Sequence, residues 1–518
     1  MGETPSARTM DHDRIRTLWA IAAYHADRTP EGVALDYRGR ETTYAQMAAR
    51  AEAMDAALRI SGAQPGERIA YLGKNCDLYF PLLFAASRGG FVLVPLNWRL
   101  APDEWTFILE DAEVKRLVHD DDFADEAREQ AQRIPGLELL RIDDLGTQPP
   151  EALEPPRDDP AAVSVQMYTS GTTGRPKGAM LSNWNVIAQR AIGYRQGVDW
   201  YNTAEDVTLL LSPVAHIAGT GFGLFGLYPG GRVVIAREFD PAETVRLMNE
   251  TGVTIALFVP SSLQMLLDYL EASGERVNAL RLIAYGASPM PEAILARAQA
   301  MLPSGFIQMY GMTETAGVAS ALAPEFHVGA DRPKLRSAGN AWPGGEVAVV
   351  DAAGHFLQQG EEGEIVVRSE QVMQGYWKRP EATAEVMLSG GWFRTGDMGR
   401  IDEDGFLTVF DRVKDMIITG GENVYPAEVE NLLFTHPAIR DVSVIGRPSA
   451  KWVEEVVAVV TLEPGASLTL AELREWARGK IAGFKIPRAL ATIDQLPRNA
   501  GGKVLRRELR DAQLAMLD

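Results

Sequence analysis

The sequence predicts an α/β protein with a large N-terminal part and a smaller C-terminal part, because its pattern changes twice along 518 residues. Between about residues 207 and 286, short runs of Val, Ile and Leu alternate with amphipathic segments of helix length, which is typical of βαβ units around a mostly parallel sheet. From about residue 345, shorter alternating strands with Gly and Asp turns favour an antiparallel or barrel-like subdomain. From about residue 415, helix and strand patterns alternate again over a length that suits a small α+β domain.

Residue types and the positions of Pro and Gly predict the individual strands and helices. Strands rich in β-branched residues are expected at 207–213, 232–236, 254–260 and 280–286. A helix is expected at 241–251, because Pro241 suits a first helical turn and Gly252 suits the position after a helix. Strands at 346–357 and 400–412 are broken by turns, and segments 426–439, 441–446, 454–464 and 470–481 predict helix, strand, strand and helix.

Composition and charge restrict the class of protein. Hydrophobic residues make up 46% and charged residues 23%, which are ordinary values for a soluble globular protein. The net charge of −19 disfavours nucleic acid and anionic membrane as partners. A single cysteine, Cys76, cannot form an internal disulfide, and the apolar stretch 80–96 is interrupted by Arg88-Gly89-Gly90. We therefore expect a cytoplasmic protein with no integral membrane segment.

A loop rich in glycine and hydroxyl groups carries the sharpest chemical signal. Residues 168–179 read YTSGTTGRPKGA and follow an alternating strand, AAVSVQMY. Glycines let backbone N–H groups approach phosphate oxygens, hydroxyls add donors, and Lys177 supplies a positive charge. The loop differs from a Walker A motif, because Pro176 precedes Lys177 and Gly178 follows it. It predicts a phosphate-binding loop.

This loop resembles the signature of the adenylate-forming superfamily, and we identify the sequence with its acyl-CoA synthetase branch. Further segments resemble that family in the same order: YGMTET at 310–315, GYWKRPE at 375–381, WFRTGD at 392–397, DRVKDMIITGGENVYPAE at 411–428 and PRNAGGK at 497–503. The resemblance implies an N-terminal adenylation domain over 1–411 with the ATP and acyl pockets, a hinge at 412–414, and a small mobile C-terminal domain over 415–518 with a catalytic lysine.

The resemblance also implies roles for individual residues. Lys503 would bridge the attacking carboxylate and the α-phosphate, Glu314 would hold Mg²⁺, and Thr313 would donate to the α-phosphate. Asp397 and Arg412 would bind the ribose, Lys414 falls at the hinge, and Gly421 would line the passage of the pantetheine arm. The other implied nucleotide-binding positions are Thr169, Ser170, Gly171, Thr172, Thr173, Gly174, Lys177, Gly286, Ala287, Ser288 and Tyr310.

The implied reaction uses ATP, Mg²⁺ and CoA. A carboxylic acid and ATP would give acyl-AMP and pyrophosphate, and the CoA thiol would then displace AMP. His216 stands where amino-acid-activating relatives place an Asp, and a neutral imidazole cannot pair with an ammonium ion, so an amino acid is disfavoured. His216 would lie at the entrance of an acyl pocket built from 215–226, 258–265, 284–289 and 311–319. Because fifteen residues follow Lys503, free CoA is the expected acceptor.

Several alternatives stay open at this point. The acid is either an aliphatic fatty acid or an aryl acid of the cinnamate or benzoate type. A light-emitting luciferase and a non-catalytic nucleotide-binding homologue are further alternatives, although Lys503, Glu314, Asp397 and Lys177 are all present. The expected partners are the acid, ATP and CoA, with a homodimer as one option for the assembly.

Overall fold

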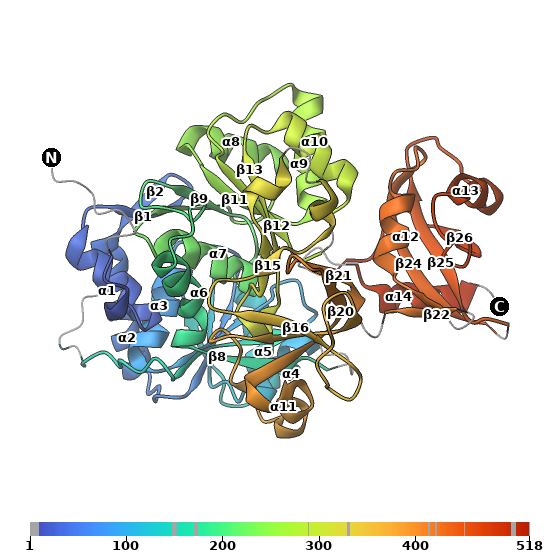
Figure 1. Cartoon of the computed structure of the whole chain (residues 1–518). Coiled ribbons are helices and arrows are strands. Elements are labelled where there is room, and N and C mark those ends of the chain that lie inside the picture. Colours follow the sequence, from blue (N-terminus) through green and yellow to red (C-terminus); the bar gives the residue numbers. More distant parts are fainter. Residues whose placement is uncertain are drawn as a thin grey trace.

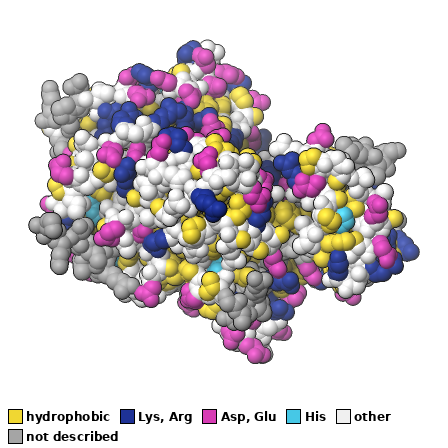
Figure 2. Space-filling view, turned by 90° about the horizontal axis from the view of Figure 1, so that it is seen from above, with side chains coloured by type: hydrophobic (Ala, Val, Ile, Leu, Met, Phe, Trp, Pro, Cys, Tyr) yellow, Lys and Arg dark blue, Asp and Glu magenta, His cyan; other side chains and the backbone are white. Residues whose placement is uncertain are grey.

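The protein folds around four β-sheets, three in a large N-terminal body and one in a smaller C-terminal body (Figure 1). This computed structural model describes residues 10–147, 152, 154–169, 175–288, 290–328, 332–412, 415–419, 422–449, 451–498 and 504–516. No helix among these residues is long and apolar enough to cross a membrane. Acidic and basic side chains are interspersed on the face seen in Figure 2, so the net negative charge is not gathered there into one patch.

The first sheet has nine strands in the order β15-β14-β13-β12-β11-β9-β10-β1-β2. Strands β13 to β1 along this order are parallel, which confirms the βαβ pattern expected from residues 207–286. The strands are β1 (Val33–Tyr37), β2 (Arg40–Thr43), β9 (Val207–Leu210), β10 (Arg232–Ile235), β11 (Ile255–Phe258), β12 (Leu282–Gly286), β13 (Gly305–Tyr310), β14 (Ser320–Leu322) and β15 (Asn340–Ala341).

The second sheet has seven strands in the order β18-β8-β7-β4-β3-β5-β6. Within it, β7 and β8 form an antiparallel pair, so the predicted phosphate loop joins adjacent strands and Thr169 faces Lys177 in register. The strands are β3 (Arg68–Leu72), β4 (Val92–Leu96), β5 (Arg116–His119), β6 (Glu138–Arg141), β7 (Val163–Thr169), β8 (Lys177–Ser182) and β18 (Gly375–Tyr376).

Helices fill and cover these two sheets. Figure 1 shows α3, α6 and α7 in the space between them, and buried residues of both sheets and of these helices form one continuous core. The helices of the N-terminal body are α1 (Leu18–Arg28), α2 (Tyr44–Ile60), α3 (Tyr79–Gly89), α4 (Pro102–Asp111), α5 (Ala124–Arg133), α6 (Asn183–Arg195), α7 (Ile217–Leu227), α8 (Pro241–Thr251), α9 (Pro260–Ser273), α10 (Glu292–Met301) and α11 (Pro380–Val386). The predicted helix at 241–251 is confirmed.

The third sheet is the antiparallel unit expected after residue 345. It consists of β16 (Glu346–Val350), β17 (Glu362–Arg368), β19 (Met387–Leu388), β20 (Trp392–Ile401) and β21 (Leu407–Arg412). All its pairings are antiparallel. β20 and β21 form a hairpin whose far end leads into the C-terminal body.

The C-terminal body has its own sheet and core. Its elements are β22 (Ile417–Thr419), β23 (Glu422–Val424), α12 (Pro426–Leu433), β24 (Ile439–Ser449), β25 (Val453–Leu462), α13 (Leu470–Ala477), β26 (Ala489–Thr492) and α14 (Arg506–Met516). α12 is shorter than the segment 426–439 suggested, because Pro437 cannot continue a helix and the chain turns before β24. Cys76, in the N-terminal body, is buried and free, and burial raises the pKa of its thiol to about 11.

Candidate active site

A cavity of about 760 Å³ opens at the carboxyl ends of four parallel strands of the first sheet. The strands β9, β11, β12 and β13 end there, and such strand ends are the usual ligand position in α/β sheets. Helices α6 and α7, the β7–β8 hairpin and the start of β20 supply further parts of the wall. All four segments expected to build the acyl pocket contribute lining residues, among them Phe222, Val259, Ala287 and Val318.

The β7–β8 hairpin brings Thr169 and Lys177 to the cavity wall. The Lys177 Nζ lies 5.2 Å from the centroid of the Tyr376 ring. Of the described residues, no carboxylate lies within 4 Å of this ammonium group, so its charge is available to an anion. Ser170, Gly171, Thr172, Thr173 and Gly174, which were predicted to complete the phosphate loop, lie outside the described residues.

The loop after β13 folds tightly back on itself and presents Thr313 and Glu314 to the cavity. A Cβ on Gly311 would lie 2.3 Å from the carbonyl oxygen of Gly317, so this position admits no side chain. The Gly317 N–H donates to the Met312 carbonyl at 3.0 Å, which closes the turn. This packing fixes the backbone that holds the Glu314 carboxylate.

Glu314 is 8% exposed and its carboxylate is oriented by two hydroxyl groups. Thr169 Oγ1 donates to Oε1 at 3.2 Å, and Tyr376 Oη donates to the same oxygen at 2.9 Å. The described residues contain no cluster of three or more acidic, His or Cys ligands. A single carboxylate suits Mg²⁺, which is usually held by one or two carboxylates with phosphates and water completing its shell.

The end of β12 places Gly286 and Ala287 on the cavity wall, whereas Ser288 is not among the lining residues. A Cβ on Gly286 would lie 2.2 Å from the Met309 carbonyl oxygen, so the neighbouring strand requires glycine there. Ala287 has φ +66°, in the left-handed region that costs a non-glycine residue energy. The wall is therefore flat and close to the backbone, as a planar base would require.

Tyr310 of the first sheet and Asp397 of the third sheet are in contact. The Tyr310 hydroxyl donates to Asp397 Oδ2 at 2.7 Å, and Asp397 is 6% exposed. Asp397 also pairs in register with Arg412 on β21, while its neighbours Thr395 and Gly396 line the cavity. The residues expected at the ribose thus lie on adjoining strands beside the cavity.

His216 is the N-cap residue that precedes α7, and it lines the cavity. Its Nε2 is buried without a hydrogen-bond partner among the described residues. Burial lowers the pKa of His216 to about 4, and the positive charge of Arg99 acts in the same direction. The imidazole is neutral at neutral pH, which agrees with the argument against an ammonium-bearing substrate.

Three predicted residues of the C-terminal part, Lys414, Gly421 and Lys503, lie outside the described residues. Two other features of the site carried no predicted role. Tyr376 follows Gly375 in the segment 375–381. Its place in that motif could have indicated a role at the site. Arg190 of α6 also lines the cavity, and no motif in the sequence around it indicated that position.

Comparisons with known proteins agree with this geometry. The model of the AMP-binding enzyme family matches residues 22–377, and that of the AMP-binding enzyme C-terminal domain matches residues 428–503. A fatty acid–[acyl-carrier-protein] ligase of Streptomyces coeruleorubidus is 36% identical over 512 residues, covering 97% of each chain. A feruloyl-CoA synthase of a Streptomyces species is 38% identical over 492 residues, covering 94% of this chain and 96% of the relative.

A solved structure shares the architecture of both bodies. The o-succinylbenzoate coenzyme A synthetase of Bacillus subtilis, in complex with ATP and a magnesium ion, superposes with a TM-score of 0.84 at 30% identity, covering 96% of this chain and 99% of that one. Sequence, fold and cavity therefore agree, and the chain belongs to the family of AMP-binding enzymes as an AMP-forming acid–thiol ligase.

Proposed function

We propose that this protein converts an aryl carboxylic acid to its CoA thioester through an acyl-adenylate. The observation that carries the proposal is one continuous cavity with Lys177 and Glu314 in one part of its wall and aromatic side chains in another. Such a cavity can hold the phosphates of ATP and an apolar acid side by side, which is what adenylate formation requires.

In the first step, the acid carboxylate attacks the α-phosphorus of ATP, the bond to the β-phosphate oxygen breaks, and pyrophosphate leaves. Lys177 would attract the phosphates, and Thr313 would donate to the α-phosphate. Glu314 would hold Mg²⁺, which neutralises charge on the phosphates when it is bound. Asp397 would accept the ribose hydroxyls, Tyr310 and Gly286–Ser288 would contact the adenine, and Lys503 would bridge the two anions that react.

In the second step, the CoA thiol attacks the acyl carbonyl and AMP leaves. We propose that residues 415–518 rotate about the hinge at 412–414, so that Lys503 withdraws and Gly421 lines the path of the pantetheine arm. The positions of the residues in the sequence support this rotation. Those that contact nucleotide in this proposal precede residue 413 except for Lys503, so Lys503 must be brought to the site by the C-terminal part.

The apolar wall favours an aryl acid over a long aliphatic chain. Phe222 and Phe225 are stacked with ring centroids 6.0 Å apart and an interplanar angle of 20°, and both line the cavity. Flat aromatic walls pair well with an aromatic ring. The feruloyl-CoA synthase relative, whose name refers to an aryl acid, supports the same choice.

A second candidate acceptor is the pantetheine thiol of a carrier protein, which the fatty acid–[acyl-carrier-protein] ligase relative favours. We further propose a cytoplasmic location, supported by the unpaired Cys76, and a homodimer as the assembly to be tested by light scattering.

The test is a product analysis with Mg²⁺, ATP and a panel of aryl and aliphatic acids, with CoA or a pantetheinylated carrier protein. We expect AMP, pyrophosphate and aryl-CoA. Formation of ADP and phosphate would contradict adenylation, a preference for fatty acids would contradict the substrate class, and transfer to the carrier alone would favour the second acceptor.

A further inference from the structure

Arg190 is a buried cation in the wall of the cavity. It extends from α6 and is 2% exposed. Its Nη1 donates to the Val186 carbonyl and its Nη2 to the Gly221 carbonyl, whereas Nε has no hydrogen-bond partner among the described residues. No carboxylate of the described residues lies within the 4 Å that defines an ion pair. Within the described part of the chain, the guanidinium is thus partly satisfied by neutral groups and lacks a counterion.

Two other arginines of the cavity wall form ion pairs with carboxylates, unlike Arg190. Arg237 contacts Asp120 and Asp122, and Arg394 contacts Glu364. Burial lowers the pKa of Arg190 to about 10, so the side chain still carries its charge at neutral pH. A buried charge without a partner is costly, and an anionic or strongly accepting ligand group would remove that cost.

Space is open beside this guanidinium because α7 has a glycine there. Of the described atoms, only Arg190 Nη2 would lie within 4 Å of a Cβ on Gly221, at 3.5 Å. The other glycines of α7 are packed closely: a Cβ on Gly219 would lie 2.2 Å from the Pro213 carbonyl oxygen, and one on Gly223 would lie 2.1 Å from the Phe80 ring. Gly221 therefore leaves room in the cavity at the guanidinium.

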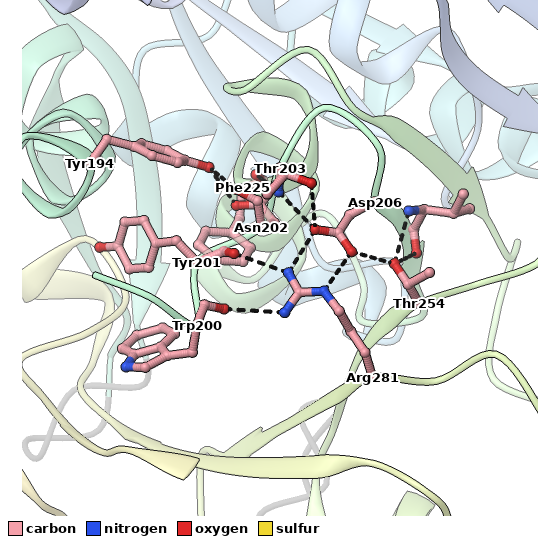
Figure 3. A network of polar contacts seen from close by, with 10 residues as sticks. Tyr194, Trp200, Tyr201, Asn202, Thr203, Asp206, Phe225, Thr254 and Arg281 are labelled. Atoms are coloured by element: carbon pink, nitrogen blue, oxygen red, sulfur yellow. Dashed lines mark hydrogen bonds and ion pairs between the residues drawn. The ribbon is translucent and has the colours of Figure 1, made fainter. Parts of the chain in front are cut away.

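The wall that carries Arg190 is held from behind. The Gln189 carbonyl accepts hydrogen bonds from Tyr201 Oη at 3.0 Å and from Trp342 Nε1 at 3.3 Å. Figure 3 shows the segment of Tyr201 tied into a polar network, in which Arg281 binds Asp206 through Nε and Nη2 at 2.7 and 2.6 Å. Asn202 in the same network donates to the Phe225 carbonyl of α7.

This network limits the movement of α6 and α7 around the guanidinium. It leaves a fixed cation beside a space, with aromatic rings on one side. A preorganised donor of this kind discriminates strongly between ligands that can and cannot accept its hydrogen bonds.

We propose that Arg190 determines substrate specificity by binding an oxygen acceptor at the end of the acid that is distant from the reacting carboxylate. The inference rests on the proposed function, since it takes the acyl group to occupy this cavity. The acceptor is either a second carboxylate or a phenolic oxygen, because both offer lone pairs to the Nη–H groups that do not bond to the Val186 and Gly221 carbonyls.

The first experiment uses the wild-type protein and acids that differ at one position. Cinnamic acids with 4-carboxy, 4-hydroxy and 4-methyl groups keep a similar shape while changing the acceptor. We expect kcat/KM for adenylate formation to be about 10- to 100-fold higher for one or both oxygen-bearing acids than for the 4-methyl acid, the range of a hydrogen bond to a charged group. The better of the two identifies the acceptor.

The second experiment compares three substitutions. Arg190→Met removes the charge with an unbranched side chain, and Arg190→Lys restores a charge without the planar fork. Arg195→Met is the matched control, because Arg195 lies on the same helix and pairs with Asp13 at the surface. We expect Arg190→Met to abolish the preference for oxygen-bearing acids, Arg190→Lys to restore part of it, and Arg195→Met to leave it unchanged.

Calorimetric titration of the same acids separates this inference from the proposed function. Arginine-dependent binding without adenylate formation would support the role of Arg190 and contradict the ligase reaction on these acids. Thioester formation with equal preference for the 4-methyl acid would overturn the inference and leave the ligase intact. Equal losses for all three acids in a folded Arg190→Met protein would also overturn it, since a merely structural arginine would act in that way, and absence of binding by all three acids would do the same.

Discussion

Glu314 is the residue on which the metal-dependent part of the proposed mechanism depends. Its carboxylate is oriented by Thr169 and Tyr376, which link the phosphate loop to β18. We predict that Glu314→Gln lowers turnover by about 100-fold or more, because it removes the charge that faces Mg²⁺ while keeping the shape. The measurement is pyrophosphate release as a function of Mg²⁺ concentration.

Two further substitutions provide comparisons for the Glu314→Gln result. Tyr376→Phe keeps the carboxylate and removes one orienting hydroxyl, so its effect should be smaller than that of Glu314→Gln. Glu325→Gln, at an exposed position nearby in sequence, should leave turnover unchanged. A near-wild-type rate for Glu314→Gln at limiting Mg²⁺ would remove Glu314 from the metal site.

At the residue scale, the sequence could predict those side chains whose neighbours form motifs. The loop at 311–317 and the β7–β8 hairpin supply Glu314, Thr313, Thr169 and Lys177 to one cavity, as expected. Arg190 could not be assigned a role, because its position depends on the approach of α7 from another part of the chain. Long-range packing of this kind has no local signature in a single sequence.

At the element scale, α7 shows how glycines of one helix divide into two kinds. Gly219 lies so close to the backbone of Pro213 that a side chain would clash there, whereas Gly221 faces the cavity. We predict that Gly219→Ala destabilises the protein by about 1–3 kcal/mol through overpacking. Gly221→Ala should leave stability equal or raise it by up to about 1 kcal/mol, since alanine favours helix. Thermal denaturation of both variants measures these effects.

Activity completes the comparison between the two glycines. The added methyl group of Gly221→Ala occupies cavity space beside Arg190, so KM for a 4-substituted aryl acid should rise more than KM for an unsubstituted one. Equal stability losses in both variants would contradict the assignment of Gly221 to the cavity wall.

Element types were predictable where the hydrophobic period was regular, as in the strands of residues 207–286. Element lengths were less so. α12 ends at Leu433 and β24 continues to Ser449, beyond the expected strand at 441–446. β24 is long because it pairs with β25 over ten register positions, and such a partner is absent from any local pattern.

At the scale of the whole molecule, three histidines with lowered pKa values make stability depend on pH. Burial lowers the pKa of His25, His216 and His327 to about 4 each, compared with 6.5 when exposed. Above pH 6.5 these groups are neutral in both the folded and the unfolded chain. As pH falls from 6.5 to 4, protons bind the unfolded chain first, so the free energy of unfolding decreases.

Urea denaturation between pH 7 and pH 4.5 measures this decrease. We predict that His327→Gln, which keeps a side chain able to bond with Tyr285, reduces the slope of stability against pH in this window. His355→Gln is a suitable control, because His355 is exposed and its substitution should leave the slope nearly unchanged. An identical slope in His327→Gln and the wild type would contradict a buried, neutral His327.

The division into a large and a small body is the feature of the whole molecule that the proposed reaction uses. The two bodies contact each other near the predicted hinge: Tyr425 Oη donates to Glu362 Oε2 at 3.0 Å, and the rings of Tyr425 and Phe410 stack at 4.8 Å. Arg506 of α14 pairs with Asp411 at the end of β21. These contacts are polar or aromatic, so exchanging them in a rotation costs little buried apolar area.

The two half-reactions should therefore respond to different residues. Lys503→Ala removes a cation needed only while carboxylate meets phosphate, so it should slow adenylate formation by several orders of magnitude. Preformed acyl-adenylate should still be converted to thioester. Gly421→Leu should do the reverse, because its side chain would fill the path of the thiol. Single-turnover kinetics of each half-reaction measures both effects, and equal slowing of both halves by each variant would contradict domain alternation.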